Sequence, residues 1–283
     1  MGKSKRRREF VPRPREALGR SRKEIMTVGE IADLCEEIAP QGTALDWDNP
    51  GLLAGSRQWE VKKVYIALDC TDECLDAALD AKADMIITHH PLIFSPIKSV
   101  VEENFIGKRL VRLIENHIAL FAMHTNFDIC RMGTLVAARL KLSDVEPLDT
   151  CGFDDGRGLG GVGTLESAMT LEQLSLDVKN ALGLPGLKTF GNPQSVCRRA
   201  AFLPGSGKSD IDTALAAGAD VYITGDVDHH SGIDAVEKGI AVIDAGHWGM
   251  EHFFIEYVDL FLKGRTAGLE TACAPYVSPF QVY

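Results

Sequence analysis

Residues 84–94 read Asp-Met-Ile-Ile-Thr-His-His-Pro-Leu-Ile-Phe. The short apolar run 85–87 predicts a buried strand, and Pro91 ends any regular strand pairing. Two adjacent histidines, His89 and His90, therefore follow the carboxyl end of a buried strand, where open α/β sheets place their ligands. A histidine pair of this kind also occurs with one ring exposed and the other packed in a core. The rest of the chain has to decide between these two interpretations.

The composition is typical of a globular protein in a reducing compartment. The 283 residues suit one large or two ordinary domains, and 45% of them are hydrophobic while 25% are charged. We find no apolar run of membrane-spanning length and no signal-peptide core near the N-terminus, so we expect a cytoplasmic protein. The seven cysteines are scattered and contain no Cys-x-x-Cys pair, which favours reduced thiols over disulfides or a thiolate metal site.

The charge is divided unevenly along the chain. Residues 1–25 contain ten Lys or Arg against three Glu, and this segment predicts a basic disordered tail. The rest of the chain has 20 basic and 37 acidic side chains, a net charge of −17. Such an acidic body argues against general binding of nucleic acid phosphates. We therefore expect a small-molecule substrate and no nucleic acid partner.

Two α/β domains are predicted after the tail. The first covers residues 26–130, where Thr27 and Glu30 have the spacing of a capping box at the start of an apolar helical stripe. The second covers residues 131–249. The pattern leaves open whether residues from about 250 to 283 return to complete the first domain.

The second half repeats the plan of the first. When residues 75–88 are placed over residues 211–224, eight of the fourteen positions are identical without a gap. In both halves a later predicted strand ends in a histidine, His124 in the first half and His247 in the second. We therefore predict two related α/β domains whose strand ends face a shared, metal-containing cleft.

Histidines and carboxylates gather at the predicted strand ends. Asp128 follows His124 by four residues, and Glu251 follows His247 by the same interval, so a helix starting there would bring the second pair to one ion. Taken singly, Asp128 could cap a helix and Glu251 could be a solvated acid of a first helical turn. The histidines at or just beyond strand ends are His89, His90, His124, His229, His230, His247 and His252.

Imidazole and carboxylate ligands without thiolates suit a divalent first-row metal such as Zn, Mn, Fe, Co or Ni. A bridging carboxylate can hold two such ions about 3.5–4 Å apart. Elsewhere, residues 204–209 read Pro-Gly-Ser-Gly-Lys-Ser, but Phe202 stands where a phosphate-binding P-loop requires glycine. We interpret this segment as a glycine turn that lines the cleft, near a ligand phosphate.

Several of these segments resemble, in order, the motifs of the Nif-three-like family, the GTP cyclohydrolase I type 2 homologues. The resemblance extends over about residues 26–283 and includes the final Ser-Pro-Phe at 278–280. Its motifs are Trp-Asp-Asn-Pro-Gly-Leu-Leu-Ala-Gly at 47–55, the opening stretch at 84–94, His-Thr-Asn-Phe-Asp at 124–128, Thr-Gly-Asp-Val-Asp-His-His at 224–230 and Asp-Ala-Gly-His-Trp-Gly-Met-Glu at 244–251.

The resemblance implies a two-domain Nif-three-like fold, a toroidal homohexamer and a dinuclear metal site that faces the inner cavity. It places Asp128 and Glu251 as bridging ligands, and it leaves His124, His229 and His230 as candidate catalytic or substrate-facing groups. The full set of implied ligands to the two divalent ions is His89, His90, Asp128, His247 and Glu251.

Three functions are compatible with this pattern. The first is a metal-dependent hydrolase with the GTP cyclohydrolase activity that the family name carries, in which metal-activated water attacks a nucleotide-like substrate. The second is a metal-binding regulatory or interaction protein without turnover. The third is a hydrolase of small phosphodiesters. No segment of the sequence specifies guanine or a triphosphate, so whether the protein is an enzyme is left open.

Overall fold

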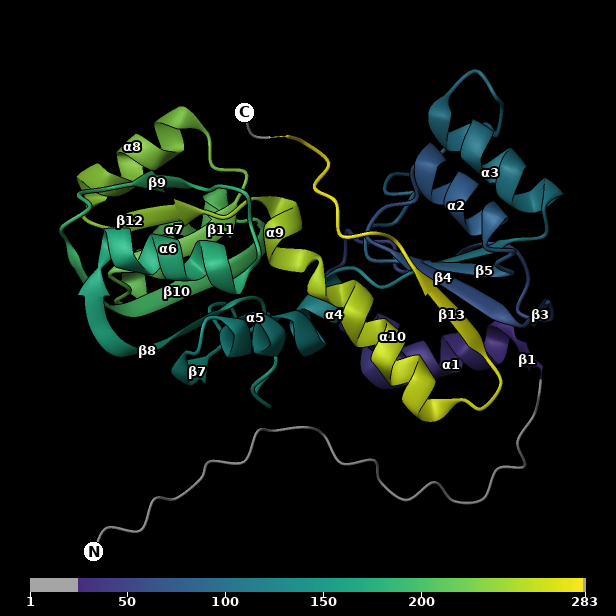
Figure 1. The fold of residues 1–283 in the computed structure, drawn as a ribbon, viewed down its shortest axis with the longest axis horizontal. Coiled ribbons are helices and arrows are strands. Elements are labelled where there is room, and N and C mark those ends of the chain that lie inside the picture. Colours follow the sequence, from purple (N-terminus) through teal and green to yellow (C-terminus); the bar gives the residue numbers. More distant parts are fainter. Residues whose placement is uncertain (1–24, 282–283) are drawn as a thin grey trace, which may run out of the picture.

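The computed structural model describes residues 25–281 of the chain, so the predicted basic tail lies outside the described residues apart from Ile25. The described residues form two lobes, each built on its own sheet (Figure 1). Both sheets are mixed and are covered by helices, which confirms a mixed α/β fold. The proposed domain division near residues 130 and 249 stays a prediction.

The first sheet has five strands and delivers the opening stretch to its edge. Its central strands β4, β5 and β6 run parallel, β13 is parallel to β4, and β2 is antiparallel to β6. The last strand of the chain therefore returns to the first sheet. The strand order is β13 (Glu270–Cys273), β4 (Lys63–Ala67), β5 (Met85–Thr88), β6 (Ala119–Ala122) and β2 (Gly51–Ala54).

The second sheet has six strands around a similar parallel centre. Strands β10, β11 and β12 run parallel, while β8 is antiparallel to β10, β7 to β8, and β9 to β12. The strand order is β7 (Ser143–Glu146), β8 (Gly161–Thr170), β10 (Val196–Ser206), β11 (Val221–Gly225), β12 (Ala241–Asp244) and β9 (Lys188–Phe190).

The internal repeat of the sequence corresponds to the same hydrogen bonds in the two lobes. A carboxylate oxygen of Asp84 accepts the backbone N–H groups of Lys62 and Lys63 at 2.7 and 3.0 Å. At the matched position, Asp220 accepts the backbone N–H groups of Arg198 and Arg199 at 2.7 and 2.9 Å. Each aspartate thus ties the start of one parallel strand to the loop before the next, which explains why this residue recurs at the offset of 136.

The helices divide between one inner layer and two outer layers. A single core joins both sheets through α1 (Val28–Ile38), α5 (Gly133–Arg139), α6 (Leu171–Ala181), α9 (His247–Glu251) and α10 (Phe253–Arg265). The outer face of the first sheet is covered by α2 (Asp72–Asp80) and α3 (Phe105–Glu115). The outer face of the second sheet is covered by α7 (Ile211–Ala216) and α8 (His229–Lys238). The shared core fixes the two lobes against each other.

Short elements complete the chain, and local signals start several helices. The predicted capping box is confirmed, because Thr27 and Glu30 bond each other's backbone N–H at the start of α1. The remaining elements are β1 (Met26–Thr27), β3 (Glu60–Val61), α4 (Thr125–Phe127), a π-helical turn (Asp128–Met132) and two 3₁₀ turns (Gln41–Thr43 and Lys208–Asp210).

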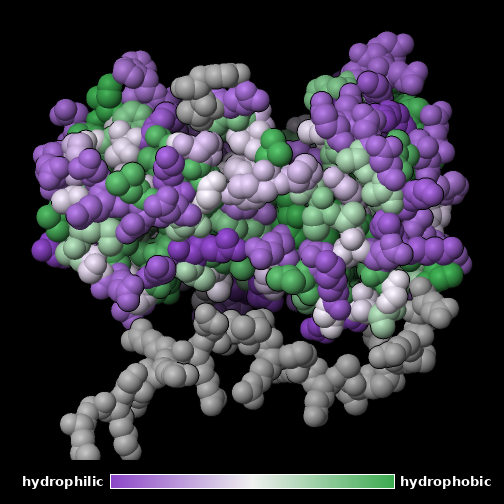
Figure 2. Space-filling view, viewed as in Figure 1, coloured by the Kyte–Doolittle hydropathy of each residue, from purple (hydrophilic) through white to green (hydrophobic). Residues whose placement is uncertain are grey.

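Polar side chains cover most of the face drawn in Figure 2, with apolar residues scattered among them. Within residues 25–281, no helix combines the length and the apolar character needed to cross a membrane.

Candidate metal centre

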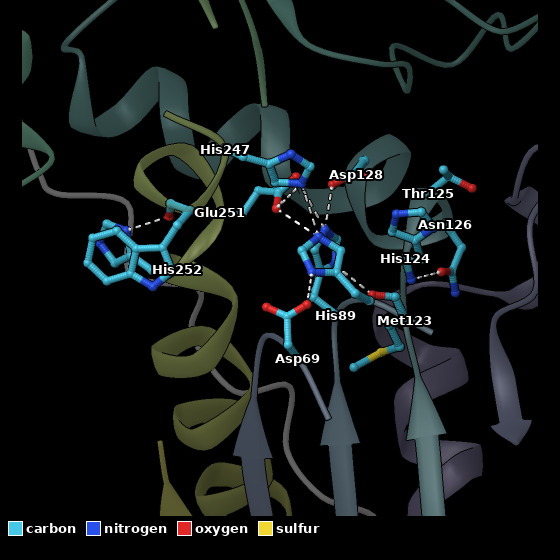
Figure 3. A network of polar contacts seen from close by, with 12 residues as sticks. Asp69, His89, Met123, His124, Thr125, Asn126, Asp128, His247, Glu251 and His252 are labelled. Carbon is cyan, nitrogen blue, oxygen red and sulfur yellow. Dashed lines mark hydrogen bonds and ion pairs between the residues drawn. The ribbon is translucent and has the colours of Figure 1, made fainter. Parts of the chain in front are cut away.

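Three chain segments carry the site residues to one place between the lobes. His89 and His90 directly follow β5, and His124 follows the neighbouring parallel strand β6. His247 begins α9 shortly after β12 of the second sheet, and Glu251 ends that helix. Figure 3 shows the side chains from these strand ends and from α9 pointing toward one another. The carboxyl ends of parallel strands from both sheets thus form the candidate site.

His89 is fully buried at the centre of this cluster. Its Nδ1 lies 2.7 Å from the carbonyl oxygen of Met123, and because a carbonyl only accepts, Nδ1 carries the proton. The Nε2 lone pair is then directed at Asp128 Oδ1, 3.4 Å away, and Glu251 Oε1, 3.7 Å away. In the described part of the chain, His89 Nε2 and Asp128 Oδ1 are buried without a hydrogen-bond partner. Two buried acceptors that face each other require a proton or a cation between them.

His90 and His247 are each oriented by an aspartate from outside the cluster. His90 Nδ1 donates to Asp69 at 2.8 Å, and His247 Nδ1 donates to Asp226 at 2.8 Å. Their Nε2 atoms lie 3.0 and 3.1 Å from the same oxygen, Glu251 Oε2. An imidazole held at one nitrogen by a carboxylate is the usual arrangement of a metal-binding histidine.

His124 is oriented in the same way. Its Nδ1 donates to Asp48 at 2.7 Å, and the other carboxylate oxygen of Asp48 accepts from the backbone N–H of Thr125 at 2.9 Å. The imidazole of His124 lies next to the histidine pair, with ring centroids 5.3 Å from His89 and 5.6 Å from His90.

The structure brings all five implied metal ligands together, and it adds His124. Three overlapping groups have ligand atoms within 4.8 Å of one another: His89 with His90 and His124; His90 with His247 and Glu251; and His89 with Asp128 and Glu251. These clusters are consistent with metal binding, and the role of each residue as a ligand stays a prediction.

Three other histidines that follow predicted strand ends take different positions. His229 and His230 lie on the exposed first turn of α8, with ring centroids 5.1 Å apart, and belong to none of the three groups. Their predicted catalytic role stays a prediction. His252 is buried and stacks on Trp248 at 4.9 Å. Burial, the main cause, lowers the pKa of His252 to about 4, which keeps this imidazole neutral.

The two buried carboxylates at the centre have opposite protonation tendencies. Burial and the neighbouring Glu251 raise the pKa of Asp128 to about 8. Burial also opposes ionisation of Glu251, but hydrogen bonds from His247 and His90 hold the pKa of Glu251 well below its usual value. In the metal-free protein at neutral pH, Glu251 is therefore the ionised partner and Asp128 retains a proton.

The imidazoles beside Glu251 are protonated in the same state. Burial would lower the pKa of His90, but hydrogen bonds to Asp69 and Glu251 raise it to about 10. Burial likewise acts against the charge on His247, and bonds to Glu251 and Asp226 raise its pKa to about 9. A divalent ion would take the place of these protons, since metal binding to imidazole and carboxylate releases them. Three features fit such an ion. They are the imidazole and carboxylate donors, the buried atoms without a hydrogen-bond partner, and the protons that the imidazoles hold in the metal-free protein.

Sequence reasoning missed three aspartates that orient the site, and it predicted only the segment that contains a fourth residue, Gly205. Asp48, Asp69 and Asp226 hold the histidine rings. A signal was available, because Asp48 and Asp226 lie within the family motifs and Asp69 follows β4. Gly205 lies in the predicted glycine turn with φ of +75°, and a Cβ added there would lie 2.7 Å from Glu251 Oε1. This glycine therefore lets the end of β10 approach the Glu251 carboxylate.

The family assignment rests on most of the described chain. The family model for Duf34/NIF3 (NGG1p interacting factor 3) matches residues 26–278. The chain belongs to the NIF3 family. This confirms the resemblance found in the sequence motifs, and it agrees with the two-sheet fold and the cluster at the strand ends.

Curated relatives and a solved structure support the same assignment. A GTP cyclohydrolase 1 type 2 homolog of Clostridium perfringens is 34% identical over 229 residues, covering 80% of this chain and 87% of that protein. A homolog of the same name from Methanocaldococcus jannaschii is 35% identical over 249 residues, covering 85% and 96%. The crystal structure of a Staphylococcus aureus hypothetical protein matches with a TM-score of 0.82 at 28% identity, covering 91% of this chain and 99% of that chain.

Proposed function

We propose that this NIF3-family protein holds two divalent metal ions and acts as a hydrolase on a nucleotide-like small molecule. The observation that carries the proposal is the cluster of imidazoles and carboxylates with two buried atoms, His89 Nε2 and Asp128 Oδ1, that lack a hydrogen-bond partner. The name of the relatives makes GTP the first substrate to test.

Two of the three groups suit one ion each. His89, Asp128 and Glu251 would hold the first ion, and His90, His247 and Glu251 would hold the second. Glu251 belongs to both groups through its two oxygens, so we assign the bridging position to Glu251. Two bound divalent ions would polarise a carbonyl or phosphoryl oxygen and lower the pKa of water toward about 7.

His124 is the residue of this chain best placed to move a proton. Asp48 holds its Nδ1, so Nε2 is the atom available for exchange with a reacting group beside the histidine pair. Asp48 would also stabilise the imidazolium after proton uptake. The homohexamer implied by the family resemblance is a further part of the proposal, which the size of the assembly in solution would test.

The decisive experiment is elemental analysis of the purified full chain with GTP turnover assayed on the same samples. We expect about two ions per chain in the wild type and loss of both metal and turnover in His89→Ala. Two ions without turnover of GTP would contradict the cyclohydrolase assignment and favour a metal-binding regulatory role or another substrate. No metal in the wild type after reloading would overturn the proposal.

His117→Asn is the matched control. His117 is an exposed histidine with φ of +57°. Its ring lies tilted against Trp59, with centroids 4.5 Å apart, and it is outside the cluster. Asparagine tolerates this left-handed backbone conformation, so the substitution removes an imidazole with little strain. Its metal content should equal that of the wild type.

A further inference from the structure

Two large aromatic side chains are exposed beside the candidate metal centre. Trp47 is 57% exposed and Phe94 is 51% exposed. Their ring centroids lie 5.6 Å apart, so they form one aromatic surface although they come from separate loops. Both rings also contact His124, with centroid distances of 6.1 Å from Trp47 and 6.2 Å from Phe94. Exposure of two such rings leaves a large apolar area unburied and is not required by the fold.

The loops that carry these rings are fixed to the site by hydrogen bonds. Trp47 directly precedes Asp48, which accepts from His124 and Thr125. The side-chain amide of Asn49 donates to the carbonyl oxygen of Ile93 at 2.6 Å, next to Phe94. The aromatic surface is therefore prearranged relative to His124, and binding a ligand there costs little ordering of the loops.

Position and charge both favour a planar, uncharged ring as the ligand. The imidazole of His124 lies between the aromatic surface and the histidine pair. The centroid of the His124 ring is 5.6 Å from that of His90. A ring stacked on Trp47 or Phe94 would thus lie within reach of both His124 and the metal-binding groups. The nearby carboxylates of Asp48 and Asp69 repel an anion, so they favour an uncharged ring at this edge of the site.

We propose that Trp47 and Phe94 form the stacking surface for a planar heteroaromatic ring of the substrate, such as a nucleobase. This inference rests on the proposed function for its substrate class, and it assigns the part of the molecule that the metal groups do not hold. Base-to-aromatic stacking tolerates different bases, because every base has a π-face. The surface would hold the ring in place while His124 and the metal centre act on it.

The test compares binding of GTP, ATP and inorganic triphosphate to the metal-loaded full chain by calorimetry. We expect Trp47→Ala and Phe94→Ala each to weaken nucleotide binding about tenfold, equivalent to about 1.4 kcal/mol, while triphosphate binding is unchanged. Trp47→Phe should retain most of the nucleotide affinity, because it keeps an aromatic face. Phe105→Ala removes a ring that is 61% exposed elsewhere, and it should change nothing.

Specific results would overturn this inference. The first is absence of nucleotide binding to the wild type. The second is an equal loss of affinity for nucleotide and for triphosphate in the alanine variants. The third is unchanged nucleotide binding in Trp47→Ala. If unchanged binding comes with a smaller assembly in sedimentation, the aromatic surface is a contact between copies of the chain instead.

The stacking surface and the proposed hydrolase activity can fail separately. Ring-dependent nucleotide binding without turnover would support the surface and contradict the hydrolase. Turnover with an unchanged KM in both alanine variants would support the hydrolase and contradict the stacking surface.

Discussion

The Nε2 atoms of His90 and His247 lie 3.2 Å apart, although 157 residues separate them in the chain. One ring follows β5 of the first sheet, and the other begins α9 after β12 of the second. Asp69 and Asp226 hold the outer nitrogens, so the two inner nitrogens meet at Glu251. The candidate metal centre therefore depends on the contact between the two lobes.

Asp128→Asn should stabilise the metal-free protein and abolish metal binding at the group it shares with His89. The pKa of Asp128 is raised to about 8, so its ionisation opposes folding. This cost is absent below the ordinary pKa of about 3.9, grows as pH rises, and is complete above pH 8. Urea unfolding of chelator-treated protein should show a larger gain for Asn at pH 8 than at pH 5.

The metal content of the same variant separates stability from function. If Asp128→Asn binds as much metal as the wild type, the assignment of Asp128 as a ligand is wrong. If the gain in unfolding free energy does not grow with pH, the carboxyl group of Asp128 is ionised without cost in the metal-free fold.

Gly205→Ala should displace the Glu251 carboxylate and reduce metal binding. The new Cβ would lie 2.7 Å from Glu251 Oε1, and the residue has φ of +75°. The backbone conformation alone costs roughly 1–2 kcal/mol for a residue with a side chain. Elemental analysis and urea unfolding measure the two effects.

Gly218→Ala is the control for Gly205→Ala, because Gly218 has φ of +74° and open space around its Cβ position. Gly218→Ala should lower the free energy of unfolding by a similar amount, because of its backbone conformation, but it should retain full metal content. Equal metal content in both variants would show that the close approach of β10 to Glu251 does not matter for the site.

Asp84→Ala and Asp220→Ala should destabilise the protein by similar amounts, on the order of 1–3 kcal/mol each. Each aspartate accepts two backbone N–H groups at the start of a parallel strand, and the two positions correspond in the repeat. Urea unfolding at pH 7 checks the comparison. A large loss for one variant and none for the other would mean that the two repeats stabilise their lobes differently.

The thiols should react slowly with alkylating reagents in the native protein. Cys273 is the exposed cysteine, yet partial burial and the neighbouring Asp259 raise its pKa to about 11. Because only the thiolate reacts, alkylation at pH 8 should be roughly a hundredfold slower than for a free thiol and should accelerate as pH rises toward 11. Mass spectrometry of iodoacetamide-treated protein tests this, with guanidinium-unfolded protein as the reference for full reaction. Rapid native labelling of Cys273 would contradict it.

Local signals predicted much of the architecture because they depend on near neighbours in the chain. The capping box at Thr27 and Glu30 formed as expected, since its hydrogen bonds span only three residues. The apolar run before His89 formed β5, and the repeat marked by Asp84 and Asp220 corresponds to parallel strands in both lobes. Such features need no knowledge of the rest of the fold.

The sequence by itself determined that histidines and carboxylates follow buried strands, and that the chain has the motifs of the NIF3 family. Only the tertiary structure decided which of these side chains meet. It brought His124 beside His89 while leaving His229 exposed on α8, and it placed Asp48 and Asp69 behind the rings. The physical reason is that these distances are set by packing of both sheets on one shared core, which no local pattern records.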